Sequence, residues 1–262
     1  MNNLRGVYII WYRDLLRLWH DKIRLIGAVL MPLMFLFVFG SGLSRTMGLI
    51  GPGVNFAQFV FPGIVAMTVL MNAFMSGISI VWDREFGFLK EVLVAPINRA
   101  SVAAGKTLGA ATVAMINGTI ILAFAPLIEV SLSPGIVAQL LPSMFLLAIA
   151  MGSFGVLLAT RIRTMEAFQA MMQLLMFPMI FLSGVFFPLS GIPTWLGVIA
   201  KINPATYGVS IIRQIVLGGT PDPSFEIVIF GQTMSLWNNV GILAAFGTVM
   251  IFLSMWSFGS QE

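Results

Sequence analysis

Hydrophobic and polar residues alternate along this chain in long blocks. A helix that crosses a lipid bilayer needs roughly 20 consecutive, mostly apolar residues. Six stretches meet this requirement without a single charged side chain: residues 25–43, 56–82, 107–128, 135–160, 169–188 and 235–258. The pattern predicts an all-α polytopic membrane protein with six transmembrane helices, formed as a single transmembrane domain over residues 1–262.

The composition agrees with this prediction. Hydrophobic residues make up 58% of the 262 and charged residues 9%, whereas soluble domains carry about 25% charged residues. The chain has no Cys and one His, His20. Disulfides, thiolate nucleophiles and Cys/His metal clusters are therefore excluded, and no metal site is expected. The net charge of +4 is small, so we expect no nucleic-acid partner.

The positive charges predict the orientation of the chain. Cytoplasmic loops of membrane proteins carry an excess of Lys and Arg. With the N-terminus in the cytoplasm, eleven of the 14 Lys and Arg residues lie on the cytoplasmic side, and only Arg45, Lys201 and Arg213 lie outside. Six spans then leave both termini in the cytoplasm.

Residues 1–24 precede the first span and have helical periodicity. Their apolar residues recur on one stripe: Leu4, Val7, Tyr8, Trp11, Leu15, Leu18 and Trp19. Most of the charged residues lie off that stripe. This predicts an amphipathic interface helix on the cytoplasmic leaflet, in contact with membrane lipid. A helix packed against a soluble partner is the alternative.

Residues 189–219, on the outer side, are apolar but interrupted by Pro193, Lys201 and the Asn203-Pro204 pair. Neither half is long enough to cross a bilayer. The segment therefore predicts an extracellular re-entrant hairpin of two short helices, provided that protein covers the backbone at the turn.

The loop over residues 83–106 is the most charged stretch between spans. Asp83 is a candidate N-cap, and residues 84–94 can form about three helical turns with an apolar face of Phe86, Leu89 and Leu93. Pro96 ends the helix, because the residue before a proline avoids the α conformation. The pattern over residues 83–95 thus predicts a short amphipathic helix that a cytosolic partner can displace. A solvated helix without a partner is the alternative.

Two runs of residues resemble the ABC-2 type transporter permeases. The first is the signature loop, Arg84-Glu85-x-Gly87-x-Leu89-x-Glu91-x-Leu93-x-x-Pro96-Ile97-x-Arg99 with Gly105-Lys106. The second comprises Leu182-Ser183-Gly184-Val185-Phe186-Phe187-Pro188, Ile192-Pro193-x-Trp195-Leu196, Asn203-Pro204-x-Thr206-Tyr207 and Arg213. The resemblance covers the whole chain, and exporters of the daunorubicin-permease and nodulation-exporter type are the most similar.

The resemblance implies a function. Helix 83–95 is expected to be a coupling helix that docks on a separate ATP-binding subunit, which binds ATP and Mg. Two copies of each chain form the transporter, so the permease is expected to be a homodimer, with a heterodimer as the alternative. The chain itself is expected to be no enzyme and to hold no cofactor. The expected coupling residues are Arg84, Glu85, Phe86, Gly87, Leu89, Glu91 and Pro96. The expected activity is export of an amphiphilic or lipid-linked substrate across a bacterial cytoplasmic (inner) membrane.

Few polar side chains lie deep in the predicted spans. A buried amide needs a hydrogen-bond partner, so each must meet another helix, water or substrate. Asn117 is expected to bond between helices, because Gly105 and Gly109 form a close-packing GxxxG pair in the same span. By resemblance, the second and fifth spans line the substrate path, with these residues: Asn72, Ser76, Met172, Gln173, Met176, Phe181 and Phe187.

Other functions are weighed against this one. Residues 100–107 satisfy a relaxed P-loop pattern, but a transmembrane segment follows and Lys106 is expected at the lipid headgroups. A membrane-bound transferase would need a cluster such as Asp14, His20 and Asp21, which we expect to be solvated. A secondary transporter of small amphiphiles is the main alternative. The spans lack the ionisable groups that proton coupling commonly uses, which favours an external ATPase.

Overall fold

The computed structural model describes residues 3–47, 49–51, 54–87, 98–189, 192–218, 228–229 and 232–259. Helices dominate these residues. The helices are α1 (Asn3–His20), α2 (Lys22–Met47), α3 (Phe56–Met75), α4 (Ile78–Glu85), α6 (Arg99–Leu122), α7 (Pro134–Arg161), α8 (Met165–Phe181), α9 (Thr194–Ile202), α10 (Pro204–Val216) and α11 (Leu236–Gly259), with a 3-10 turn η1 (Ala125–Ile128). Two small hairpins pair β1 (Leu49–Gly51) with β2 (Val54–Asn55) and β3 (Val228–Ile229) with β4 (Gln232–Thr233).

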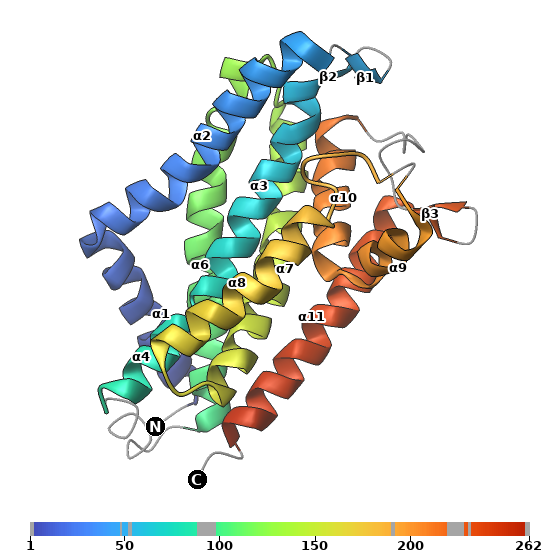
Figure 1. Ribbon diagram of the computed structural model, residues 1–262. Coiled ribbons are helices and arrows are strands. Elements are labelled where there is room, and N and C mark those ends of the chain that lie inside the picture. The colour runs from blue at the N-terminus through green and yellow to red at the C-terminus, as the bar shows by residue number, and fades with distance from the viewer. Residues whose placement is uncertain are drawn as a thin grey trace.

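The helices form a bundle, as Figure 1 shows. Among the described residues, four helical stretches are long and apolar enough to cross a membrane: Phe56–Glu85, Ala100–Leu122, Pro134–Arg161 and Leu236–Gly259. They correspond to four of the six predicted spans. The predicted spans 25–43 and 169–188 fall on α2 and α8, where shorter apolar helices occur, Leu25–Val38 and Met165–Phe181. The predicted helical architecture with several membrane-length apolar helices is confirmed apart from the two small hairpins, and the count of six spans stays a prediction.

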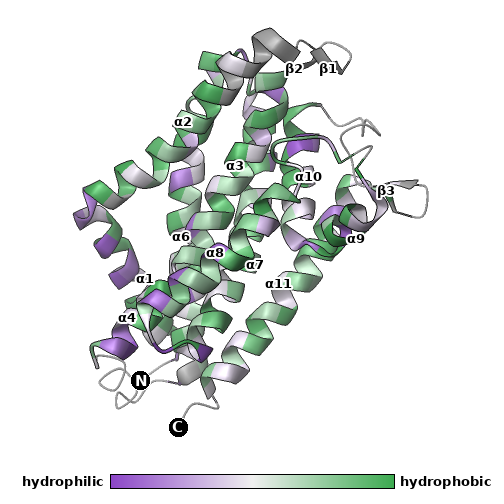
Figure 2. Ribbon diagram, viewed as in Figure 1, coloured by the Kyte–Doolittle hydropathy of each residue, from purple (hydrophilic) through white to green (hydrophobic). Residues whose placement is uncertain are grey.

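Polar residues concentrate at the ends of the bundle. In Figure 2 the long helices are mostly hydrophobic, whereas hydrophilic residues gather on α1 and at the end of α4. The start of α1, the end of α4 and the end of α11 lie at the same end of the bundle (Figure 1). We call this the terminal end. Both ends of the described chain therefore lie on one side, as an even number of spans requires.

The core lies where α3 and α7 meet α6, α10 and α11. Two glycines allow the closest crossing. A Cβ on Gly77, in the turn between α3 and α4, would lie 2.5 Å from the carbonyl oxygen of Gly155 in α7, and a Cβ on Gly155 would overlap the carbonyl oxygen of Phe74. The backbones of the α3–α4 turn and of α7 are in direct contact. This close crossing is possible because Gly77 and Gly155 have no side chain.

The segment of the predicted re-entrant hairpin forms two short helices, α9 and α10, of nine and 13 residues joined at Asn203. Their entry into the outer leaflet stays a prediction. Every residue of α10 from Ala205 to Val216 is buried. It packs on α3, α7 and α11, so protein covers the turn and the second helix, as the sequence requires.

Candidate functional site: the terminal end of the bundle

Five charged side chains from three helices meet at the terminal end. They are Arg13, Asp14 and Arg17 of α1, Asp83 of α4 and Lys106 of α6, and we call them the charge cluster. Lys106 lies at its centre and is 2% exposed. Its Nζ is 3.2 Å from Asp14 Oδ1 and 3.5 Å from Asp83 Oδ2, and it donates a 2.8 Å hydrogen bond to Ser79 Oγ. One buried cation thus bridges the two carboxylates.

The arginines of α1 complete the cluster. Arg13 Nη2 donates to Asp83 Oδ2 at 2.7 Å, and Arg17 Nη2 approaches Asp83 Oδ1 at 3.4 Å. Asp83 is 2% exposed. It accepts hydrogen bonds from Arg13 and Arg17 of α1 and forms an ion pair with Lys106 of α6. With three cations and two carboxylates, the cluster carries one net positive charge.

The GxxxG pair of α6 brings α1 close enough to form the cluster. A Cβ on Gly105 would lie 2.9 Å from the Cβ of Ile10, and one on Gly109 would lie 2.9 Å from Asp14 Oδ2. Trp11 Nε1 adds a 2.9 Å hydrogen bond to Thr112 Oγ1. The prediction of close packing at this pair is confirmed, and its partner is the N-terminal helix.

This packing gives α1 a second face that the sequence did not predict. The buried positions are Gly6, Ile10, Asp14 and Leu18, which follow one another every four residues. Three residues of the predicted lipid-facing stripe, Leu4, Tyr8 and Trp19, are exposed at 80%, 59% and 78%. Exposed aromatic and aliphatic residues are typical of a helix that also faces lipid.

Two further expectations are wrong at the same place. Lys106 does not lie at the headgroups, because it is buried within the charge cluster. Asp14 is not solvated, because its carboxylate pairs with Lys106. His20 and Asp21 are exposed, so the three residues of the hypothetical transferase site do not gather. Residues 100–107 lie inside the continuous helix α6, which leaves no phosphate-binding loop.

The predicted coupling residues begin at the end of α4. The prediction that Asp83 is an N-cap is wrong. Asp83 lies inside α4, and its side chain points into the charge cluster. Helix α4 ends at Glu85, and Gly87 has a positive φ of 82°, a conformation that glycine adopts readily. Phe86 is 59% exposed and packs on Trp82. The remaining coupling residues, Leu89, Glu91 and Pro96, lie outside the described residues, as does most of the predicted helix 83–95.

Arg84 and Glu85 bind the connection between α7 and α8. The Arg84 guanidinium donates to the carbonyl oxygens of Ile162 at 2.7 Å and of Ala159 and Thr160 at 3.2 Å. Glu85 Oε2 accepts a 3.1 Å hydrogen bond from the backbone N–H of Met165. The cation thus lies at the C-terminus of α7 and the carboxylate at the N-terminus of α8, where each complements the helix dipole.

Two polar residues of the second family-like run, Asn203 and Arg213, connect the hairpin to neighbouring segments. Asn203 caps α10 by accepting from Ala205 N, and its Nδ2 donates to Met179 O at 2.7 Å. Arg213 is buried, donates to Gly184 O at 2.6 Å and stacks over the Phe59 ring at 4.1 Å. These contacts anchor the hairpin to the end of α8 and to α3.

The predicted path residues of α3 do not line one surface. Asn72 is half-buried, and its Oδ1 accepts a 3.1 Å hydrogen bond from Nδ2 of Asn117. Ser76 is buried at the α3–α4 turn and lines a cavity of about 40 Å³ beside Asp14 and Arg17. The interhelical bond expected for Asn117 is confirmed, and Asn72 is its partner.

The path residues of α8 and of the segment after it are distributed over several environments. Gln173 is exposed and Met172 is half-buried, whereas Met176 is 2% exposed and packs in the core. Phe181 is exposed and contacts Phe186 at a centroid distance of 5.2 Å. Phe187 is half-buried. Their assignment to a substrate path stays a prediction.

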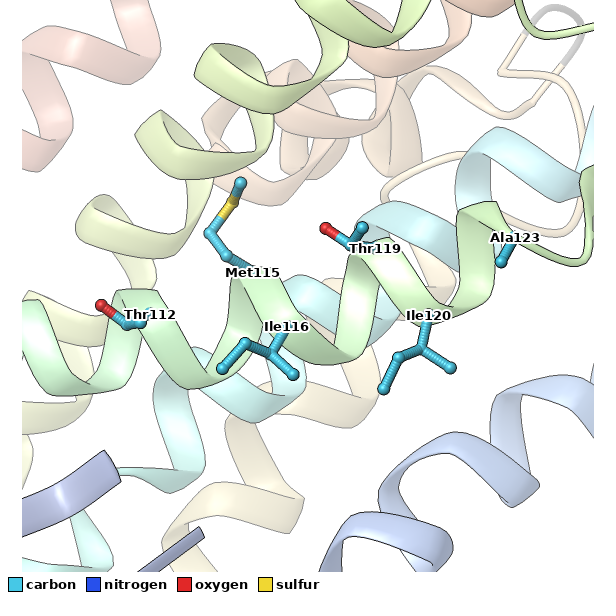
Figure 3. A pocket seen from close by; sticks show the side chains of 6 residues that line it. All are labelled: Thr112, Met115, Ile116, Thr119, Ile120 and Ala123. Atoms are coloured by element: carbon cyan, nitrogen blue, oxygen red, sulfur yellow. The ribbon is translucent and has the colours of Figure 1, made fainter. Parts of the chain in front are cut away.

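An apolar hollow of about 490 Å³ lies along α6 and is lined by none of these path residues. Its lining comes from a single helix: Thr112, Met115, Ile116, Thr119, Ile120 and Ala123. In Figure 3, Ile116 and Ile120 project from one side of α6, and Met115 and Thr119 from another. The hollow is therefore an open helix surface, and none of its lining residues is acidic or basic.

We expect Asn72→Leu to lower the free energy of unfolding by about 1 kcal/mol, because it leaves the buried Asn117 amide without its partner. The double variant Asn72→Leu/Asn117→Leu should recover most of this loss. Thermal unfolding of the purified chain in nanodiscs measures both effects, with Gln173→Leu as the exposed control. Wild-type stability of Asn72→Leu would show that the bond contributes nothing.

Sequence reasoning missed the charge cluster, although one signal could have found it. Asp14 continues the four-residue spacing of Gly6 and Ile10, and such a spacing marks one face of a helix. An acidic residue on a face that otherwise carries small and apolar residues requires a basic partner. Lys106, one residue after Gly105 of the GxxxG pair, is that partner.

Comparison with known proteins identifies the family. The family described as ABC-2 type transporter matches residues 5–217. A putative transport permease, ycf38, of Cyanophora paradoxa is 31% identical over 215 residues, covering 80% of this chain and 73% of its own. Nodulation protein J of Rhizobium leguminosarum bv. trifolii is 25% identical over 252 residues, covering 95% and 88% of the two chains.

A third relative is longer than this chain. The probable multidrug ABC transporter permease YbhR of Escherichia coli K12 is 29% identical over 198 residues, which cover 75% of this chain and 52% of the relative. The chain thus matches about half the length of YbhR. The family match spans the charge cluster, both ends of the loop between α4 and α6, and the hairpin contacts described above. The chain belongs to the ABC-2 type transporter family, whose members are transmembrane components of transport systems and not catalytic subunits.

Proposed function

We propose that this chain is the permease subunit of an ATP-driven exporter in a bacterial cytoplasmic membrane. A separate ABC ATP-binding subunit, in two copies, binds ATP and Mg and supplies the energy. Two copies of the permease form the membrane part. The loop between α4 and α6 receives the ATPase, and the terminal end of the bundle is the cytoplasmic end.

The contacts of Arg84 and Glu85 are the observation that carries the proposal. They fasten the entrance of the loop to the α7–α8 connection through four hydrogen bonds. A force applied to the loop therefore reaches two further long helices directly. A solvated loop without a partner needs no such attachment.

The distribution of charge supports an external energy source. The six predicted spans contain no Asp, Glu, Lys, Arg or His, and proton-coupled transporters commonly place ionisable groups there. The charge cluster lies at the terminal end, away from the middle of the bundle. A secondary transporter of small amphiphiles is the alternative, and an ATPase that fails to co-purify would favour it.

An amphiphilic or lipid-linked substrate suits the exposed surface of α8. Leu174, Phe177 and Phe181 are exposed at 69%, 67% and 41% beside the exposed amide of Gln173. Apolar side chains with an isolated amide favour a molecule with a long apolar part over a hydrated ion. The relative YbhR is named a multidrug permease, which agrees with a broad amphiphilic specificity.

Replacing Glu91 by lysine is expected to reduce recovery of the ATPase with the purified permease at least tenfold. Charge reversal removes an attraction to a basic partner surface and adds a repulsion, worth together about 1.4 kcal/mol or more. Affinity purification from native membranes followed by mass spectrometry identifies and quantifies the ATPase.

The matched control is Glu166→Lys, which reverses a charge in the first turn of α8 instead of in the loop. Glu85 is a poor choice for this test, because Glu85→Lys would also break its hydrogen bond to Met165. Wild-type recovery of the ATPase with Glu91→Lys would remove the loop as the docking element. Absence of any ATPase with the wild-type chain would overturn the proposed function.

Cysteines introduced at Asn98 and Ser224 are expected to react with a membrane-impermeant maleimide from opposite sides. Asn98 is exposed at the start of α6, and the positive-inside rule predicts a cytoplasmic location for it and an outer location for Ser224. The native chain has no Cys, so labelling reports the introduced residue alone. Labelling of both from intact cells would contradict the orientation with cytoplasmic termini.

A further inference from the structure

The charge cluster lies at both ends of the cytoplasmic loop. Asp83 precedes the end of α4 by two residues, and Lys106 lies in the second turn of α6, where the chain has re-entered the bundle. Their side chains approach within 3.5 Å, and both are 2% exposed. The entrance and the exit of the loop are therefore joined through a buried ion pair.

Helix α1 is fastened to both ends by the same cluster. Arg13 and Arg17 bind Asp83 at the entrance, and Asp14 binds Lys106 at the exit. Helix α4 packs chiefly on α7 and α8, whereas α1 packs chiefly on α6. The connection between α1 and α4 is thus made by these charged side chains and not by close packing of the two helices.

A contribution to folding stability does not by itself explain why these charges are buried together. Burying charges costs desolvation energy, and apolar side chains of similar volume are often as stabilising as a buried ion pair. The contact of α1 with α6 already has apolar packing at Ile10 and the hydrogen bond from Trp11 to Thr112. The charged side chains add ion pairs that connect α1 and α6 to Asp83 of α4.

We propose that Asp14, Asp83 and Lys106 are positioning residues that couple the loop to α1, so that a displacement of the loop moves the interface helix along the membrane surface. This inference rests on the proposed function, in which the ATPase displaces the loop. Arg13 and Arg17 strengthen the coupling at the entrance. The exposed apolar face of α1, with Leu4, Tyr8 and Trp19, then carries the motion into the surrounding lipid.

The test measures whether α1 moves with the loop. Spin labels on introduced cysteines report distances from a reference on α11, and the native chain has no Cys to remove. One pair is Leu4→Cys with Trp256→Cys, and the other is Asn98→Cys with Trp256→Cys. All three positions are exposed. The labelled permease, diluted with unlabelled chain and purified with its ATPase in nanodiscs, is compared without nucleotide and after trapping with ATP, Mg²⁺ and orthovanadate.

In the wild-type background we expect trapping to shift both distances by about 2 Å or more, the scale of helix shifts in coupled proteins. The variant Asp14→Asn/Lys106→Met removes one charge of each sign, so the net charge of the cluster is unchanged. It should keep the shift of the Asn98 pair and reduce that of the Leu4 pair, because only Arg13 and Arg17 then connect α1 to Asp83. The control Trp11→Phe removes an uncharged contact between α1 and α6 and should keep both shifts.

The outcomes separate this inference from the function on which it rests. A wild-type Leu4 pair that does not shift on trapping overturns the inference, and so does a Leu4 pair that shifts by the full wild-type amount in Asp14→Asn/Lys106→Met. In both cases a co-purified ATPase would leave the proposed function standing. If no ATPase co-purifies with the wild-type chain, the proposed function fails first. The wild-type measurement decides even if the double variant does not fold.

Discussion

Replacing Lys106 by methionine is expected to lower the free energy of unfolding by about 3–5 kcal/mol, the range found when one partner of a buried ion pair is removed. Methionine fills much of the volume of the lysine side chain, so packing changes little. Asp83 keeps Arg13 and Arg17, whereas Asp14 keeps only a contact at 4.0 Å with Arg13 Nε among the described charges. The cost therefore arises from the buried Asp14 carboxylate.

The double variant Asp14→Asn/Lys106→Met distinguishes this cause from a packing defect. It removes the unpaired carboxylate, so most of the lost stability should return. Thermal unfolding in nanodiscs, followed by Trp fluorescence, compares the single variant, the double variant and the wild-type chain. Equal destabilisation of both variants would assign the loss to packing instead of charge.

Replacing Gly155 by alanine is expected to cost about 3 kcal/mol, at the upper end of what overpacking usually costs. The added Cβ would overlap the carbonyl oxygen of Phe74, and a backbone atom cannot rotate away as a side chain can. Helices α3 and α7 must therefore move apart, which weakens the packing of the core residues beside the crossing.

Gly241→Ala in α11 is the matched control, because a Cβ there has no heavy atom within 4 Å. Alanine is the better helix former, so this variant should be neutral or stabilised by up to about 1 kcal/mol. Comparing the two variants in the same unfolding assay separates steric contact from helix propensity. Equal stability of both would show that α3 and α7 can separate at no cost.

The long spans and the hairpin could be predicted because their signals are local. Four uncharged blocks became helices long enough to cross a membrane, and the interruptions at Pro193 and Asn203 marked the two short helices. The family-like residues Asn203 and Arg213 also proved to anchor the hairpin to the segment around the end of α8. Each of these features depends on residues close together in the sequence or on a repeated family pattern.

The charge cluster could not be predicted in the same way, because it joins residues far apart in the chain. Asp14, Asp83 and Lys106 each have a plausible solvated location when considered alone. Only the contact of α1 with Gly105 and Gly109 brings them together, and periodicity within one helix carries no information about that contact. The same reason explains Asn72, whose partner Asn117 lies on a different span.

The complete burial of α10 has a consequence for how the chain enters the membrane. A helix of 13 residues spans about 20 Å, short of the roughly 30 Å hydrocarbon core, and the arginine within it makes transfer into lipid unfavourable. Lipid therefore does not stabilise α10 during synthesis. Its neighbours are α3 and α7, which precede it, and α11, which follows it. The segment around Arg213 should become protected from protease only after α11 has left the translocon, so the integration of α11 completes the burial of α10.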